Sequence, residues 1–477
     1  MQGFAAPRPR ERALLLGLLP LGLLILLVVA PLLRLLWQGW GGPGVEALTG
    51  LPAPSPWAVL RDDYLRGRLV WSLTQALATC AAALLLGLPL AWVLARLEFA
   101  GRAAALRLLM LPFVVPTLVA AIGVLGLWGP RGWLGELAGV DLQGTPVLLL
   151  LGNLFFNLCL VVRAGVEALE RVDARQLAAA RTLGATPWRA FWRIEWPAIA
   201  PALASSLCLV FLYCFSGFGL ALVLGGPRYA TVEVEIYRLV AHELRLGEAG
   251  ALAAVAVLVT GAAAGAHALL AHRLAVPLRV EPVPRRSARG GPARLALVAT
   301  AAVLLVCCAL PLFTLLAQAL LAGPTAWAVL LEPETLYALW NTLRFSAVAL
   351  LLATLLGLLH ALSARRRWLW RAAGFLPFVV SPVSVAFGLL LLVPGWTASL
   401  WLLLGAYAVL AYPFVAQSVG AGLDSQPASL AQAARTLGAN PWRSFWRVTL
   451  PLLRPALRRG MAFAAASAVG EFAVTPF

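Results

Sequence analysis

The residues that could do chemistry in this chain are few, and most of them lie inside apolar stretches. Free cysteines in apolar runs are typically small core residues, and none of the cysteines here has the C-x-x-C spacing of a zinc or redox site. The six are Cys80, Cys159, Cys208, Cys214, Cys307 and Cys308. His267 and His360 lie near predicted helix ends, which favours the membrane interface over metal binding. We therefore expect no metal site and no catalytic residues.

Polar side chains inside apolar segments form a second group, because a polar group in hydrocarbon is costly and marks a functional candidate. Asn153 and Asn157 are four residues apart and share a helix face. With Tyr213 and Ser216 they are candidates for lining a translocation pathway. The alternative for each is a hydrogen bond between helices.

Glu471 is the only carboxylate that we place inside a predicted spanning segment. A carboxylate beside aromatic rings would suit an organic cation through charge and cation–π contact. The alternative, which we favour, is a role in gating or helix packing.

Composition excludes a water-soluble protein. Of 477 residues, 61% are hydrophobic and 12% charged, against about 45–50% and about 25% in soluble domains. The net charge of +17 comes from arginine alone, since the chain has no lysine. A phosphate-binding loop of the G-x-x-x-x-G-K-[ST] type needs its lysine, so the chain cannot carry its own P-loop ATPase. The arginines follow a membrane topology, described next, and not one basic face, so we expect no nucleic-acid partner.

Eleven apolar segments are long enough to span a bilayer, which needs about 20 residues. We predict an all-α, polytopic membrane protein whose first segment is a retained anchor and not a cleaved signal. The segments are 13–36, 69–95, 104–127, 145–165, 199–224, 249–271, 295–321, 340–363, 373–394, 398–418 and 455–477. With the N-terminus in the cytoplasm, most arginines lie on the cytoplasmic side, as the positive-inside rule requires.

The chain is a tandem duplication. The stretch AAARTLGATPWRAFWRIEWP at 178–197 recurs as QAARTLGANPWRSFWRVTLP at 432–451, and Leu86-Gly87-Leu88 recurs as Leu356-Gly357-Leu358. We divide the chain into a first half, 1–274, a cytoplasmic linker, 275–294, and a second half, 295–477. Parallel halves of roughly six helices each would enclose a central pathway. The second half has no counterpart of the first half's last helix, so we expect the natural protein to continue past residue 477.

The repeated stretch has a readable local structure. Gly184 and Gly438 permit a turn after a short helix, and Thr186-Pro187 and Asn440-Pro441 signal the start of a second helix. We expect Pro197 and Pro451 to end that second helix before the next spanning segment. An interfacial amphipathic helix, with its aromatic residues among lipid headgroups, is the alternative interpretation.

The repeated stretch resembles the EAA loop of binding-protein-dependent ABC importer permeases. The matching positions are Ala179, Ala180, Gly184, Pro187, Ile194 and Pro197, then Ala433, Ala434, Gly438, Pro441, Val448 and Pro451. The resemblance implies that each loop holds a coupling helix that docks on a separate ATPase subunit. The family glutamate is replaced by Ala178 and Gln432, and the family leucine by Trp196 in the first loop.

This resemblance implies a membrane-spanning permease of the bacterial inner membrane that is not itself an enzyme. Two cytoplasmic ATPase subunits would bind the ATP, and an extracytoplasmic binding protein would deliver the solute. The stretches 215–239 and 131–139 resemble fused two-half permeases for thiamine, which makes thiamine or its phosphates the expected solute. Fused iron(III) permeases are the alternative. A secondary transporter and an integral membrane enzyme are the competing classes.

Overall fold

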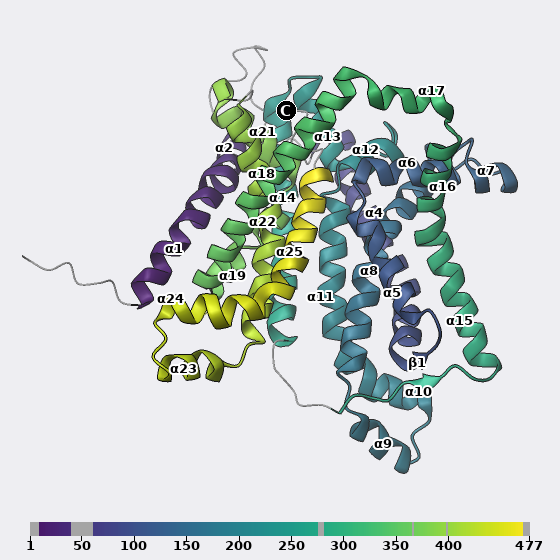
Figure 1. The fold of residues 1–477 in the computed structure, drawn as a ribbon. Coiled ribbons are helices and arrows are strands. Elements are labelled where there is room, and N and C mark those ends of the chain that lie inside the picture. The colour runs from purple at the N-terminus through teal and green to yellow at the C-terminus, as the bar shows by residue number, and fades with distance from the viewer. Residues whose placement is uncertain (1–8, 40–60, 275–280, 365–366, 397–398, 471–477) are drawn as a thin grey trace, which may run out of the picture. The chain divides into compact units, whose positions relative to one another are not determined.

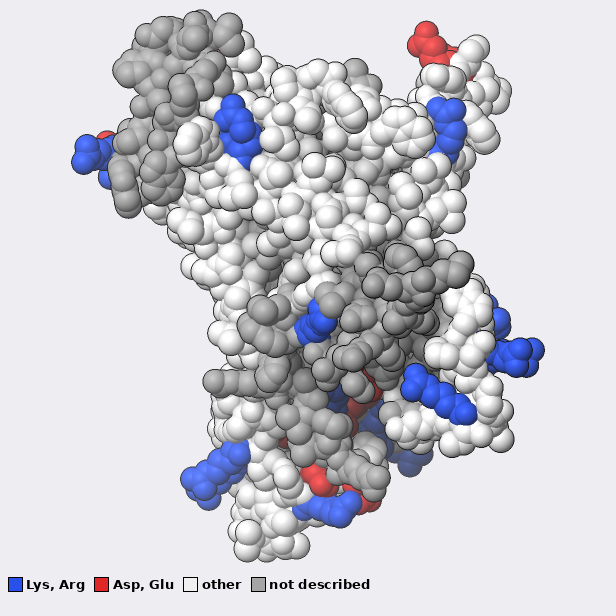
Figure 2. Space-filling view, turned by 90° about the vertical axis from the view of Figure 1, so that its left-hand side faces the viewer, with Lys and Arg blue, Asp and Glu red and all other residues white. Residues whose placement is uncertain are grey.

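The computed structural model describes residues 9–39, 61–274, 281–364, 367–396 and 399–470. Nearly all elements in this part of the chain are helices, and nine of the described helices are long and apolar enough to cross a membrane. Large apolar side chains point outward along them, among them Leu85, Leu258 and Leu351. Figure 2 shows one face of the molecule, on which charged side chains are sparse. The prediction of an all-α membrane protein is confirmed.

Three predicted spanning segments are broken and not continuous: 199–224, which forms α11 (Trp196–Phe215) and α12 (Gly219–Leu224), and the two described next. Segment 104–127 forms α5 (Arg102–Val114) and α6 (Thr117–Trp128), with Val115 extended between them. Segment 373–394 forms α19 (Trp368–Ala373), α20 (Leu376–Val379) and α21 (Pro382–Leu392). In both, a proline follows the break, at Pro116 and Pro382. Proline disfavours the helical conformation in the residue before it, and Val115 and Ser381, which precede these prolines, are both extended.

The chain divides into two compact units, residues 39–323 and residues 1–38 with 324–477. These units differ from the sequence halves because the first helices are exchanged. The N-terminal helix, α1 (Pro9–Leu24), packs against α18 (Pro333–Ala364) of the second half. The opening helix of the second half, α15 (Gly291–Leu304) with η3 (Leu305–Ala309) and α16 (Leu310–Leu321), packs against first-half helices. The compact units do not test the predicted linker, 275–294, as the boundary between the two sequence repeats, so this boundary stays a prediction.

The unit of residues 39–323 is built on α4 (Asp63–Arg96), α8 (Pro146–Glu170), α11 (Trp196–Phe215) and α14 (Leu246–Leu274). Small residues let α4 and α8 approach closely, as at many helix contacts in membranes. A Cβ at Gly87 would lie 3.0 Å from Val161, and one at Gly165 would lie 2.7 Å from Ala91. The shorter helices α12 (Gly219–Leu224) and α13 (Val232–Ala241) connect α11 to α14.

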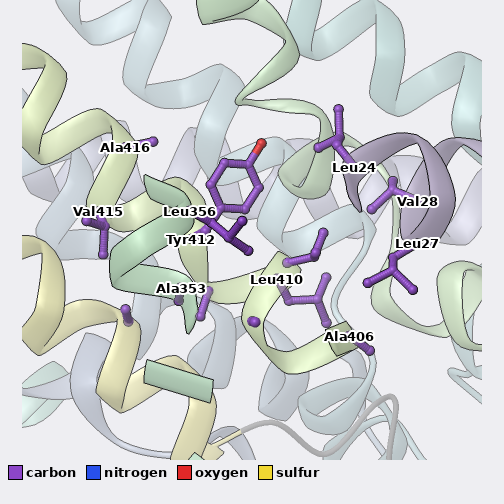
Figure 3. Packing of buried hydrophobic residues seen from close by; sticks show 14 of the residues in the cluster. Leu24, Leu27, Val28, Ala353, Leu356, Ala406, Leu410, Tyr412, Val415 and Ala416 are labelled. Carbon is purple, nitrogen blue, oxygen red and sulfur yellow. The ribbon is translucent and has the colours of Figure 1, made fainter. Parts of the chain in front are cut away.

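The other unit is built on α18, α22 (Leu400–Asp424) and α25 (Leu450–Gly470). Figure 3 shows its core, in which Leu24, Leu27 and Val28 of the N-terminal segment belong to the same cluster as Tyr412 and Val415 of α22. This segment comprises α1, the π-helical η1 (Ile25–Val29) and α2 (Ala30–Gly39). The N-terminal segment is therefore part of the hydrophobic core of this unit.

Candidate functional sites: two equivalent loops and a buried polar cluster

The first repeated loop begins with α9 (Ala174–Thr182), which ends in a Schellman motif. Gly184 has φ +76° and donates to Arg181 O at 3.0 Å, while Ala185 N donates to Ala180 O at 2.9 Å. The next helix, α10 (Pro187–Ala190), starts at Thr186, whose hydroxyl accepts from Arg189 N. Ala180 and Gly184, two of the predicted loop residues, therefore make the turn between the helices.

The second loop repeats this geometry. Its first helix is α23 (Ala428–Thr436), after which Gly438 has φ +81° and Ala439 N donates to Ala434 O at 3.0 Å. Asn440 Oδ1 accepts from Arg443 N at 2.7 Å and caps α24 (Pro441–Ser444). Two sequences 254 residues apart thus fold into the same helix–turn–helix.

The expectation that Pro197 and Pro451 end the second helix is wrong. Each second helix runs through a π-helical turn, η2 (Phe191–Glu195) or η6 (Phe445–Thr449), directly into the next long helix, α11 or α25. Trp196 N donates to Phe191 O across five residues, and Leu450 N does so to Phe445 O. Pro197 and Pro451 therefore lie inside continuous helices, two residues after the end of the π-helical turns, and neither ends its helix.

Each loop presents the same apolar side chains to the outside. Leu183 and Leu437 are 87% and 88% exposed, and Trp188 and Trp442 are both 69% exposed. Each of these tryptophans packs against another one turn later, with ring centroids 5.5 Å apart at Trp188–Trp192 and 5.4 Å apart at Trp442–Trp446. Exposed apolar groups of this size at a polar loop mark a contact surface.

The candidate pathway residues Asn153 and Asn157 bond to other groups inside their unit. Asn153 Nδ2 donates to Gln75 Oε1 at 2.8 Å, and Gln75 Nε2 donates to the carbonyl of Cys214 at 2.8 Å. Asn157 Nδ2 donates to Asn153 O at 2.9 Å. This buried cluster joins α4, α8 and α11, which is the arrangement expected of hydrogen bonds between helices.

The other candidates lie at the end of α11. Tyr213 is half-buried and its ring meets that of Phe113 edge-on, with centroids 6.0 Å apart. Ser216 is the C-cap of α11, and its hydroxyl oxygen is buried with no hydrogen-bond partner among the described residues. Glu471 lies outside the described residues. No contact in the structure tests the role of these residues in a pathway.

Sequence reasoning missed the buried carboxylates of the first unit. Glu195 lies within the continuous helix Pro187–Phe215, which is long and apolar enough to cross the membrane, so a carboxylate other than the predicted one lies in a spanning helix. Arg96 Nη2 contacts Glu195 Oε1 at 2.5 Å, and both side chains are only 8% exposed. Glu235 of α13 is also buried and accepts from Tyr64 Oη at 3.1 Å and Arg238 Nη2 at 2.7 Å. Glu195 was missed because Pro197, two residues later, was expected to separate it from the spanning helix.

Two helical units that each carry an exposed loop of the same build define a duplicated membrane permease. Residues 84–275 and 353–477 match the family described as binding-protein-dependent transport system inner membrane component. Together these stretches make up more than half of the chain, so the chain belongs to this family of ABC importer permeases. It is a multi-pass inner membrane protein. The family assignment excludes the alternative class, a secondary transporter.

Relatives extend the match along most of the chain. The thiamine transport system permease protein ThiP of Escherichia coli is 28% identical over 474 residues, which cover 91% of this chain and 88% of that protein. ThiP of Haemophilus influenzae is 33% identical over 220 residues, 44% of this chain and 41% of that protein. The sulfate transport system permease protein CysW of Synechocystis is 30% identical over 261 residues, 53% of this chain and 91% of CysW.

Proposed function

We propose that this permease moves thiamine, or a thiamine phosphate, into the cytoplasm, driven by ATP hydrolysis in a separate subunit. Support for the solute comes from the similarity to proteins named as thiamine permeases, one of which aligns with 91% of the chain. The substrate would arrive on an extracytoplasmic binding protein, as the family name implies.

The two loops are the docking surfaces for two ATPase subunits. The observation that carries this assignment is the equivalence of the two loops. The exposed fractions of Leu183 and Leu437 are 87% and 88%. Two matching surfaces suit two copies of one partner. Since Ala178 and Gln432 replace the family glutamate, the contact depends on the exposed leucine and tryptophan and not on a carboxylate.

The N-terminus lies in the cytoplasm, on the same side as both loops. Arginine is concentrated in and around these loops, as in Arg181, Arg189 and Arg193 of the first and Arg435 and Arg443 of the second. Loops that carry many arginines stay on the cytoplasmic side of the bacterial membrane.

The pathway candidates are Asn153, Asn157, Tyr213, Ser216 and Glu471. Of these, Ser216 has a buried hydroxyl that makes no bond to the described part of the chain, so it is available to a solute. Glu471 either attracts the cationic solute or holds a gate. Glu471→Gln separates the two roles, since it removes the charge and retains hydrogen bonding. Reduced thiamine uptake with normal ATPase stimulation would indicate attraction.

The test of the solute is uptake by proteoliposomes that contain the permease, its ATPase and its binding protein. Radiolabelled thiamine should accumulate only when ATP is enclosed on the loop side. Ferric iron and sulfate are the comparison solutes. Accumulation of either one in place of thiamine would overturn the solute assignment and leave the permease class intact.

A further inference from the structure

The linker is bound to the base of the first loop. Its short strand β2 (Arg286–Ser287) pairs in parallel with β1 (Leu97–Glu98), which directly follows α4. Five residues earlier, Glu281 O accepts from Ala174 N at 2.9 Å, and Glu281 Oε2 accepts from Arg175 Nε at 3.2 Å. Figure 1 shows α9, α10 and β1 at the same end of this unit. The segment 281–288 thus joins the end of α4 to the start of α9.

Arg285 adds a charged contact to the middle of this segment. Its Nη2 donates to Glu170 Oε1 at 2.9 Å and its Nη1 to Glu98 Oε2 at 3.4 Å. Glu170 is the last residue of α8 and also accepts from Arg102 Nη2 at 3.1 Å. One linker arginine therefore contacts the ends of two spanning helices. These side chains are between 38% and 58% exposed, so each pair by itself contributes little.

The strong contact is one residue away from β1. Arg96, the last residue of α4, holds Glu195 through both Nε at 3.1 Å and Nη2 at 2.5 Å. Glu195 ends the π-helical turn that joins the first loop to α11. A buried charge left without its partner is strongly unfavourable, so removal of either side chain would be costly. The linker, β1 and this ion pair form a continuous set of contacts around the first loop.

In the described part of the second loop, two of the matching groups are replaced. Thr449 stands at the position equivalent to Glu195, 254 residues later. The N-cap of α9 is Asp173, whose carboxylate accepts from Arg175 N at 3.0 Å, but the N-cap of α23 is Pro427, which has no side-chain cap. The carboxylate equivalent to Glu170 is retained as Asp424, which pairs with Arg371 at 2.7 Å.

We propose that Arg96, Glu195 and Arg285 are positioning residues that brace the first coupling loop, and that the second loop, with Thr449 in place of Glu195 and Pro427 in place of Asp173, is the more mobile of the two. The inference rests on the proposed docking of both loops on ATPase subunits. According to this inference, the two docking loops differ in mobility, although their exposed surfaces match. The braced loop would transmit motion of its ATPase partner directly to α4 and α11.

Amide hydrogen exchange of the full chain in detergent tests the brace without any partner protein. Residues 174–190 should exchange more slowly than the equivalent residues 428–444. Arg285→Glu places a third carboxylate beside Glu98 and Glu170, and should speed exchange in 174–190 by about fivefold, since two ion pairs are lost. Arg289→Glu, an exposed linker arginine, is the matched control and should have no effect. Equal exchange in the two loops, or no response to Arg285→Glu, would overturn the inference.

A second measurement connects the brace to transport. In the reconstituted complex, Glu195→Gln should lower thiamine uptake per ATP hydrolysed, and Thr449→Val at the equivalent position should not. The paired change Arg96→Glu with Glu195→Arg restores a buried pair and should recover part of the loss, even where the single variant is poorly folded. Equal effects of Glu195→Gln and Thr449→Val on the ratio would contradict the brace. If the unmodified complex transports no thiamine but the exchange asymmetry is present, the proposed solute fails and the brace stands.

Discussion

Gly184 and Gly438 hold the same backbone conformation in two loops 254 residues apart, with φ +76° and +81°. Each follows a nine-residue helix and each donates its N–H to the carbonyl of the next-to-last helix residue, Arg181 or Arg435. This conformation costs roughly 1–2 kcal/mol in a residue with a Cβ, and more in a β-branched one. The turn that orients each docking helix is therefore tied to glycine.

The double variant Gly184→Val, Gly438→Val should uncouple ATP hydrolysis from transport while the protein still inserts in the membrane. Valine would displace each docking helix, because the turn cannot keep its geometry. The measurement is substrate-stimulated ATP hydrolysis by the reconstituted complex, which should fall by more than half. Gly261→Val, in a helix with open space around it, is the control. Normal stimulation in the double variant would disprove the coupling role of these turns.

The exposed leucines of the loops should contribute directly to ATPase binding. Burial of a leucine side chain is worth about 1.5–3 kcal/mol, so Leu183→Ala with Leu437→Ala should weaken binding of the ATPase subunit by about tenfold or more. The check is the dissociation constant of the detergent-solubilised permease with its ATPase. Leu351→Ala, which removes an exposed leucine from a spanning helix, should leave it unchanged. Equal affinities of all variants would favour the interfacial interpretation of the loops.

The local signals in the sequence predicted the loops well. A threonine or asparagine before a proline caps the start of a helix, as Thr186 and Asn440 do. A glycine after the end of a helix permits the left-handed turn, as Gly184 and Gly438 do. Both signals depend on neighbouring residues alone, so they can be recognised in the sequence. The duplication was visible for the same reason, since it is a property of the chain alone.

Features that depend on distant packing were not predictable. Periodicity identifies the N-terminal helix but does not show that it joins the core of the second half. The π-helical turn before Pro197 is invisible to a rule that treats an internal proline as a stop. The partner of Glu195 is 99 residues away along the chain, so no spacing points to it. These contacts are specified by the tertiary fold, and the sequence pattern contains no trace of them.

The Gln75–Asn153 hydrogen bond should act mainly on stability. Gln75→Ala leaves the Asn153 donor buried without its acceptor, which should cost about 1–3 kcal/mol. A double-mutant cycle with Asn153→Ala should give a coupling energy of about 0.6 kcal/mol, typical of such bonds in membranes. Reversible unfolding in mixed micelles measures both. A several-fold rise in the KM for thiamine uptake with unchanged stability would instead assign Asn153 to the pathway.

The glycine contact between the second and fourth helices of each repeat gives a prediction that uses the duplication as its own control. A Cβ at Gly357 would lie 2.6 Å from Val415 Cβ, while one at Gly87 would lie 3.0 Å from Val161, the residue equivalent to Val415. The first distance is too short for any real contact, and the second requires only a small shift. Gly357→Ala should therefore be more destabilising than Gly87→Ala, in the range of about 1–3 kcal/mol for an overpacked site.

Removal of the opposing side chain should reverse this effect. In the double variant Gly357→Ala, Val415→Ala, the two methyl groups replace one large side chain, and the thermal midpoint in detergent should recover most of the loss caused by Gly357→Ala alone. Because Val415 also packs in the core, Val415→Ala alone sets the baseline, and only the coupling between the two changes is informative. Additive losses in this cycle would show that α18 and α22 are not in contact through this glycine.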